Sequence, residues 1–277
     1  MVPPVEAAFQ AHMAAWRLDG QPRTARRYTT DRNCPLPTPE DRWRCLLVYL
    51  NTDALQVVQG RLFGRGQSQA HQWLQVLLVV LQAPRRTLGD APDRAARGGA
   101  DLGARVPPVG HAGTERRLER PQAPTEPTRG DRGKNKGHTV KHVRLINAAL
   151  TSLLLRDTSA GRVHAQRMAD TTPYPWPAGR RWLQDLGFLA FTLDQVEVIM
   201  PTKKPRGRAL TRAQTAANRR IARRRVRIEH VNRRIKRCRL VHETSRLRTA
   251  GGRDRVMDIC GALHTFRVRL VPWQPMV

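Results

Sequence analysis

One segment, residues 211–240, constrains the architecture of this chain more than any other. Its apolar residues recur at steps of seven, three, four and three, the spacing of one narrow face of an α-helix. Between Asn218 and Arg239 it carries 11 Lys and Arg but a single acid, Glu229. Such a helix buries one thin seam and leaves the rest to solvent or to a charged partner. The seam comprises Ile221, Ile228, Val231, Ile235 and Cys238.

The solitary Glu229 has two possible roles. At 100° per residue, Arg225, Glu229 and Lys236 lie within about 40° of one another on the helix. Neighbouring cations favour the charged form of the carboxylate, which can then serve as the hub of an ion-pair network or as a metal ligand. Composition cannot choose between the two, and the ion-pair hub is the commoner arrangement.

The overall charge indicates a polyanionic partner. The chain has 50 Lys and Arg against 22 Asp and Glu, a formal net charge of +28, and nucleic acid is the polyanion such proteins most often bind. Membrane surfaces are the rival partner, but the longest strongly apolar run, residues 73–81, is too short to span a bilayer. No secretory signal is visible at the N-terminus, so we expect a cytoplasmic protein. The four cysteines lack CxxC spacing, which favours reduced thiols over zinc or disulfides.

Residues 39–82 predict three short helices. Thr38 and Pro39 are typical of an N-cap and a first helical position. The helices are expected over 39–50, 53–63 (with Thr52 as cap) and 67–82, with a glycine turn before the last. This arrangement fits a helix-turn-helix, whose final helix reads DNA bases, or equally a plain three-helix bundle with a polar cap. The expected inward faces are Trp43, Leu46, Leu47 and Leu50 in the first helix and Leu55, Val58 and Leu62 in the second. The candidate DNA contacts are Arg65, Gln67, Ser68, Gln69, His71 and Gln72.

The remaining pattern is α/β. Strands are expected over residues 138–147, 153–155 and 196–200, and a strand or short helix over 182–188. Two stretches poor in large apolar residues, 83–108 and 121–137, are expected to be linkers or poorly ordered insertions.

Several segments together resemble the insertion-sequence transposases of the DDE superfamily, a Harbinger-like group of DDE superfamily endonucleases. The likeness covers nearly the whole chain, and motifs that agree in order are more specific than any one of them. In chain order, the matching segments are residues 39–82 (helix-turn-helix module), Gly113-Thr114-Glu115-Arg116 (first carboxylate motif), 136–141 (entry to the next strand), Leu183-Gln184-Asp185-Leu186-Gly187-Phe188 (second carboxylate motif), 201–207 (basic loop), 225–230 with Lys236 (third carboxylate motif) and 261–267 (C-terminal segment).

The resemblance implies a ribonuclease-H-like fold, a mixed sheet with flanking helices, preceded by a small all-helical domain. It also implies three carboxylates that hold two Mg²⁺ or Mn²⁺ ions for DNA strand cleavage and transfer. Asp185 and Glu229 would be the second and third metal ligands and catalytic residues, supported by Arg225 and Lys236. Further DNA contacts are implied at Lys134, Lys136, Lys203, Lys204 and Arg206.

The chain departs from this pattern at the first carboxylate. The family motif begins with Asp, whereas this chain has Ala112, and an alanine methyl group cannot ligate a metal. Pro107 and Pro108 suit the preceding strand badly, and a His-Asp pair of the family appears here as His164-Ala165. If another carboxylate completes the site, Glu115 and Asp131 are the nearest candidates.

We therefore expect an N-terminal helical or extended segment (1–38), a helix-turn-helix module (39–82), a flexible linker (83–108) and a ribonuclease-H-like domain (109–277). The expected function is that of a bacterial, nucleoid-associated transposase which binds double-stranded transposon ends and could form a homo-oligomer, with a weakly bound divalent metal and impaired catalysis. The alternative is a catalytically inactive DNA-binding remnant or repressor. A basic RNA-binding protein is favoured by charge alone.

Overall fold

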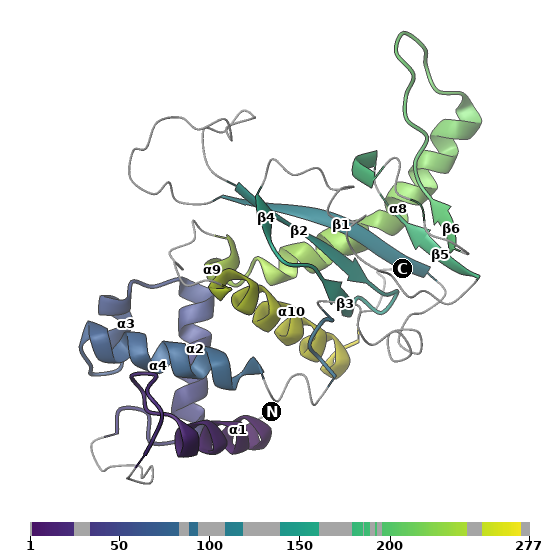
Figure 1. Ribbon diagram of the computed structural model, residues 1–277. Coiled ribbons are helices and arrows are strands. Elements are labelled where there is room, and N and C mark those ends of the chain that lie inside the picture. Colours follow the sequence, from purple (N-terminus) through teal and green to yellow (C-terminus); the bar gives the residue numbers. More distant parts are fainter. Residues whose placement is uncertain are drawn as a thin grey trace.

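The computed structural model describes residues 2–24, 34–82, 89–93, 109–118, 139–160, 179–184, 186–188, 192, 196–242 and 251–272. Helices dominate the N-terminal part, and a sheet with further helices follows (Figure 1). The mixed helix-and-sheet class expected from the sequence is therefore confirmed.

Four helices form the N-terminal part: α1 (Val2–Ala15), α2 (Pro39–Thr52), α3 (Gln56–Leu62) and α4 (Gln67–Val80). The predicted cap of α2 is confirmed, because the Thr38 hydroxyl oxygen accepts a hydrogen bond from the Asp41 backbone N–H at 3.1 Å. Helix α1 is fixed to α2 by Arg42, whose buried guanidinium binds Glu6 at 2.6 Å and lies 4.1 Å from the Phe9 ring centre. Phe9 also stacks on Trp73 of α4, so α1, α2 and α4 share one core.

The predicted start and inward face of α3 are wrong. Thr52 does not cap this helix; it ends α2, and Asp53 (φ 49°) forms the left-handed C-cap of α2. Leu55, Val58 and Leu62 are exposed by 54%, 44% and 63%, whereas Gln59 and Gly60 are buried. The reason is a contact between this helix and the turn that follows it.

That contact is made by Gly60 and the turn that follows α3. The Arg65 backbone N–H donates to the Gly60 carbonyl at 2.7 Å, and a Cβ at position 60 would meet the Arg65 carbonyl oxygen at 2.5 Å. Gln59 is held beside it by donating to the Cys45 carbonyl at 2.8 Å.

In α2, the predicted burial of Leu46 and Leu50 is confirmed, but Trp43 is half-buried and Leu47 is exposed. The buried face of α2 also includes Arg42, Cys45 and Tyr49.

The sheet has six strands in the order β3-β2-β1-β5-β6, with β4 paired to β2. β1 pairs antiparallel with β2 and parallel with β5, so it lies at the junction of an antiparallel and a parallel half. Three expected strands are confirmed with shifted ends, and the ambiguous segment 182–188 divides into the end of a strand and a 3-10 turn. The elements are β1 (Val109–Leu118), β2 (Thr139–Ile146), β3 (Ser152–Leu155), β4 (Ser159–Ala160), β5 (Arg180–Leu183), η1 (Leu186–Phe188) and β6 (Val196–Ile199).

Three helices complete the described fold: α8 (Arg212–Ile235), α9 (Arg239–His242) and α10 (Gly252–Leu270). The predicted long helix therefore ends five residues earlier than expected, and a tight turn separates it from α9. α8 packs against β1, and α10 packs against β3 and α8. Buried side chains of α1, α2, α4, α8, α9 and α10 join in a single hydrophobic cluster, which links the N-terminal helices to the sheet domain.

Part of the expected linker 83–108 is built into the fold. Residue Asp93 pairs with β3 through two backbone hydrogen bonds of 2.8 Å, to Leu153 and Leu155. The buried Asp90 carboxylate accepts from Arg269 of α10 at 2.6 Å. The expected insertion 121–137 lies outside the described residues.

His264 of α10 is a buried imidazole between cations. Its Nε2 donates to the Leu150 carbonyl at 2.9 Å. The pKa of His264 is lowered to about 4, chiefly because the imidazole is buried; the Leu150 hydrogen bond opposes the shift, and the positive charges of Arg144, Arg234 and Arg267 add to it. The imidazole is therefore neutral at pH 7.

We predict that Gly60→Ala lowers the free energy of unfolding by roughly 1–3 kcal/mol, because the new methyl group would overlap a backbone oxygen that cannot swing away. Gly66→Ala is the matched control: its Cβ meets nothing within 4 Å, and its φ of −72° suits alanine. Urea unfolding of both variants checks this. Equal stability of the two would contradict the close approach of α3 to its turn.

The lowered pKa of His264 predicts a specific acid sensitivity. Because the unfolded chain takes up a proton near pH 6.5 and the folded chain near pH 4, stability falls as pH decreases through this window, by up to roughly 3 kcal/mol. His264→Gln keeps an N–H donor but cannot titrate, so its urea midpoint should vary less between pH 6.5 and 4.5. Parallel pH profiles of the two proteins would show that His264 does not carry the effect.

Candidate active site and DNA-binding surfaces

Helix α8 presents the predicted Glu229 face as one continuous stripe. A capping box at Thr211 and Gln214 starts the helix, with hydrogen bonds of 3.0 and 3.1 Å. The helix is unbroken from Arg212 to Ile235, and Lys236 keeps helical angles at its C-cap. Arg225, Glu229 and Lys236 therefore share a side of α8 as predicted. The Glu229 side chain is exposed.

Sequence reasoning missed the contact that fixes this stripe to the sheet. Asn232, three residues after Glu229, accepts a 2.7 Å hydrogen bond from Arg144 of β2. Arg144 is 1% exposed and also lies 3.4 Å from His142 Nε2. An arginine inside a strand of Val, Leu and Ile is itself a signal, because buried guanidinium groups require polar partners. The strand was predicted, but the partner could not be.

The β-register relates this contact to the first carboxylate motif. In the antiparallel pairing of β1 with β2, Gly113 is the partner of Arg144, and Ala112 is the partner of Leu145. Arg144 contacts α8, so the row that contains Arg144 and Gly113 is on the α8 side of the sheet. The assignment of the lost carboxylate to Ala112 thus rests on the motif resemblance and not on the register.

The second carboxylate motif lies at the carboxyl end of β5, next to β1. Leu183 pairs with His111 in the parallel register. The buried Gln184 donates its side-chain amide to the Phe188 carbonyl at 3.0 Å and its backbone N–H to Ile199 of β6 at 3.1 Å. The first bond joins Gln184 to η1, and the second continues the pairing of β5 with β6. Asp185 itself lies outside the described residues.

The residues at the three motif positions do not supply a complete oxygen ligand set. Among the described side chains, no group of three or more His, Cys, Asp or Glu lies close enough together to hold a metal ion. Glu229 offers a carboxylate, whereas alanine at position 112 has no donor atom. The side chain of Glu115, and all of Asp131 and Ala165, lie outside the described part.

The candidate DNA contacts of the helical part differ in their exposure and in their neighbours. Gln67, Ser68 and Gln69 are exposed at the start of α4. His71 bonds Gln56 of α3 at 2.8 Å. His71 and Gln72 also line a groove of about 440 Å³ opposite the end of α1. Arg65 is half-buried in the turn before α4.

The basic loop 201–210 lies beside the N-terminal half of α8. Lys203, Lys204 and Arg206 are exposed in it. Asn218 of α8 accepts from the Thr202 backbone N–H at 2.8 Å and donates to the Thr202 carbonyl at 2.9 Å. Lys134 and Lys136 lie outside the described residues.

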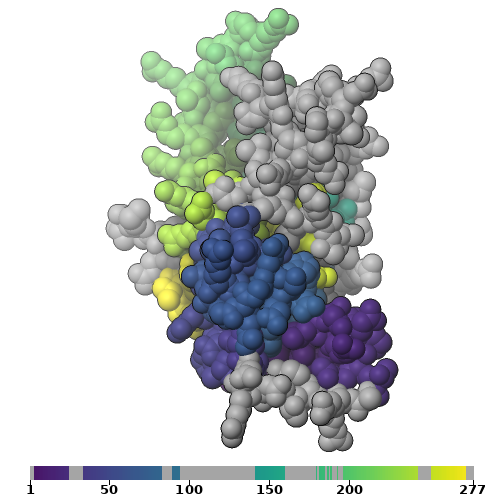
Figure 2. All heavy atoms as spheres, turned by 90° about the vertical axis from the view of Figure 1, so that its left-hand side faces the viewer, coloured from purple at the N-terminus to yellow at the C-terminus, as the bar shows by residue number. Residues whose placement is uncertain are grey.

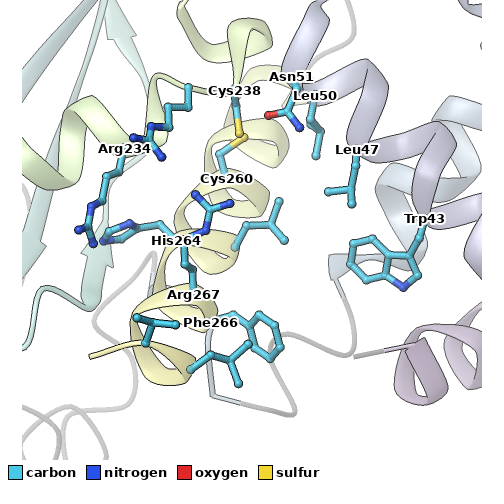
Figure 3. Close-up of a pocket in the computed structure, with 14 residues that line it drawn as sticks. Trp43, Leu47, Leu50, Asn51, Arg234, Cys238, Cys260, His264, Phe266 and Arg267 are labelled. Atoms are coloured by element: carbon cyan, nitrogen blue, oxygen red, sulfur yellow. The ribbon is translucent and has the colours of Figure 1, made fainter. Parts of the chain in front are cut away.

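A cavity of about 610 Å³ separates α2 from the C-terminal end of α8 and from α10 (Figure 3). Trp43 and Leu47 form its apolar side, and Arg234, His264 and Arg267 line the opposite side. The N-terminal helices therefore share a core with the sheet domain in one region and leave a partly cationic cavity in another.

Within the described residues, none of the helices is long and apolar enough to cross a membrane. The four cysteines are free thiols, as expected.

Comparison with known proteins identifies the group to which this architecture belongs. Residues 112–265 match the family described as "DDE superfamily endonuclease". A curated relative, "Probable transposase for insertion sequence element IS702" from Microchaete diplosiphon, is 30% identical over 123 residues. This match covers 44% of the chain and 44% of the relative, so the chain spans less than half the length of that protein. No solved structure matches.

The family match covers more than half of the chain and includes β1, the end of β5, and α8. The chain therefore belongs to the DDE superfamily endonucleases.

Proposed function

We propose that this chain is a transposase-type DNA-binding protein of an insertion sequence, with impaired strand cleavage. One observation carries the proposal: the three motif positions occur on β1, directly after β5, and on α8, and these elements are neighbours in the fold. A ribonuclease-H-like site needs this convergence of two strands and a helix. The family match and the transposase name of the relative support the same function.

The strand order supports a ribonuclease-H-like fold. The central strand β1 has an antiparallel neighbour on one side and a parallel neighbour on the other, and α8 packs against it. A Harbinger-like subgroup is part of the same proposal.

The N-terminal helices are proposed as a helix-turn-helix module. Helices α2, α3 and α4 pack together, a glycine turn precedes α4, and the amide and hydroxyl groups of Gln67, Ser68 and Gln69 are exposed at its start. Such groups can hydrogen-bond base edges or phosphates in a major groove. Double-stranded transposon ends are the proposed ligand, and the protein could bind them as a homo-oligomer.

Impaired catalysis follows from the missing carboxylate. In the family, Mg²⁺ or Mn²⁺ ions supply the activation of the nucleophile and the stabilisation of the leaving oxygen. Asp185 and Glu229 are the proposed remaining ligands, with Arg225 and Lys236 as supporting cations. Two carboxylates provide less charge and fewer coordination positions than three, so we propose weak metal binding. The alternative, an inactive DNA-binding remnant or repressor, is favoured by the same alanine.

We predict that affinity for duplex DNA falls steeply with salt, because Lys and Arg contacts release condensed counterions. Fluorescence anisotropy with matched duplex DNA and RNA measures this. An affinity that hardly changes between low and moderate salt, or a clear preference for RNA, would contradict the proposal.

If α4 reads sequence, Gln69→Ala should weaken preference for the element ends more than it weakens total affinity. Gln72→Ala tests a half-buried position of the same helix. Competition between end-sequence and unrelated duplexes separates the two effects. Equal losses on both duplexes would assign these residues to phosphate contact or to folding.

We predict little or no Mn²⁺-dependent strand cleavage by the unaltered chain, because small losses of positioning cost large factors in rate. Ala112→Asp should tighten Mn²⁺ binding in calorimetry but restore weak cleavage at best. Gly113→Asp is the matched control, because it adds the same charge one residue along the strand. Tighter Mn²⁺ binding by Gly113→Asp than by Ala112→Asp would instead assign the lost carboxylate to position 113, which pairs with Arg144. Clear cleavage by the unaltered chain, abolished by Asp185→Ala and by Glu229→Ala, would overturn the impairment.

A further inference from the structure

The N-terminal half of α8 extends away from the protein core. The buried residues of this helix are Ile228, Val231 and Ile235, all in its C-terminal half. Residues 212–227 span about 24 Å at 1.5 Å per residue. In Figure 1 this half, with loop 201–210, extends beyond β6, and Figure 2 shows it at the opposite end of the molecule from α1. Something other than core packing must account for its length and composition.

The charges of this half do not stabilise the free helix. Arg219 and Arg223, and likewise Arg220 and Arg224, are four residues apart, where like charges destabilise a helix. Arg212 lies at the positive end of the helix dipole, which is also unfavourable. The helix forms because its capping box and alanines favour it, so the arginines are better explained by a bound polyanion.

The loop and the helix are joined through Asn218. Its side-chain amide makes two hydrogen bonds with the backbone of Thr202, of 2.8 and 2.9 Å, across 16 residues of sequence. This paired contact keeps the chain from Lys203 to Arg208 beside α8. Cations of the loop and of the helix are therefore presented together before any ligand binds.

The position of this contact relates it to Glu229. At 100° per residue, Asn218, Arg225, Glu229, Asn232 and Lys236 lie within about 60° on one side of α8. Arg219 lies about 80° from the nearest edge of this stripe, and Arg223 lies about 120° from it. A ligand beside the Glu229 stripe would thus meet the loop cations at one end and Arg219 on the next side of the helix.

We propose that residues 201–210 and 212–227 form a basic arm that binds the sugar–phosphate backbone of duplex DNA beside the Glu229 stripe, with Asn218 as its positioning residue. This inference rests on the proposed DNA-binding function. Duplex DNA is a stiff rod with regularly spaced phosphates, so it binds more tightly to cations that are held in a fixed arrangement. A flexible single strand could reach separate cations and would gain less from the Asn218 contact.

The test compares variants of the full chain in binding a duplex of mixed sequence at several salt concentrations. Asn218→Ala changes no charge, and we expect an affinity loss of about three- to tenfold from the lost preorganisation. Lys203→Gln with Lys204→Gln should reduce the slope of log affinity against log salt by about two, if both contact phosphates. Arg267→Gln is the charge control, because Arg267 is exposed on α10, a helix outside both proposed DNA surfaces.

A double-mutant cycle separates positioning from a general loss of stability. In the Asn218→Ala background, the two lysine substitutions should reduce DNA affinity by a smaller factor than in the unaltered chain. The combined loss of affinity should therefore be smaller than the product of the separate losses. Circular dichroism checks that the helix content is unchanged. If the unaltered chain does not bind DNA, the proposed function fails. If it binds but Asn218→Ala and the lysine variants bind as tightly as it does, the basic arm alone is wrong. An equal loss of single-strand affinity in Asn218→Ala would overturn the duplex preference.

Discussion

The hydrogen bond between Arg144 and Asn232 is the constraint on which the arrangement of the site depends. A guanidinium that is 1% exposed must find polar partners, since an unsatisfied buried charge is far more costly than the bond is favourable. Asn232 supplies one of them at 2.7 Å. The contact fixes the rotation of α8 about its own axis against β2, while Ile228, Val231 and Ile235 bury the apolar seam. Together they hold α8, and with it the Glu229 stripe, against β1 and β2.

The same constraint divides α8 into two parts. In the C-terminal part, Ile228, Val231 and Ile235 are buried in the hydrophobic cluster that α9 and α10 share. The N-terminal part has no buried residue and is rich in arginine. Because the helix is continuous, a ligand held by the exposed half is aligned with Glu229 in the packed half.

Binding and chemistry differ in how they tolerate the loss of a residue. Phosphate contacts are many and individually weak, so the electrostatic affinity of the basic arm and of the α4 surface survives the loss of any one side chain. A two-metal centre depends on each bridging carboxylate. A family member with alanine at the first position can therefore keep DNA binding while it loses cleavage. The two proposed DNA surfaces lie at opposite ends of the molecule (Figure 1).

The sequence by itself determined the features that depend on local periodicity and capping. The Thr38 cap, the start of α4 and the strands β2, β3 and β6 all follow from spacing within a few residues, and so does the shared face of Arg225 and Glu229. Of the predicted α8 seam, Ile228, Val231 and Ile235 are buried, whereas Ile221 is half-buried and Cys238 lies in the turn after the helix. Only the tertiary structure decided which side of α3 is buried, because Gly60 packs against a turn that its own helical pattern does not reveal. It likewise joined Asp93 to β3, Arg144 to Asn232, and Asn218 to Thr202. Each of these contacts joins residues that are distant in sequence, and their free energy depends on chain folding that a local pattern does not encode.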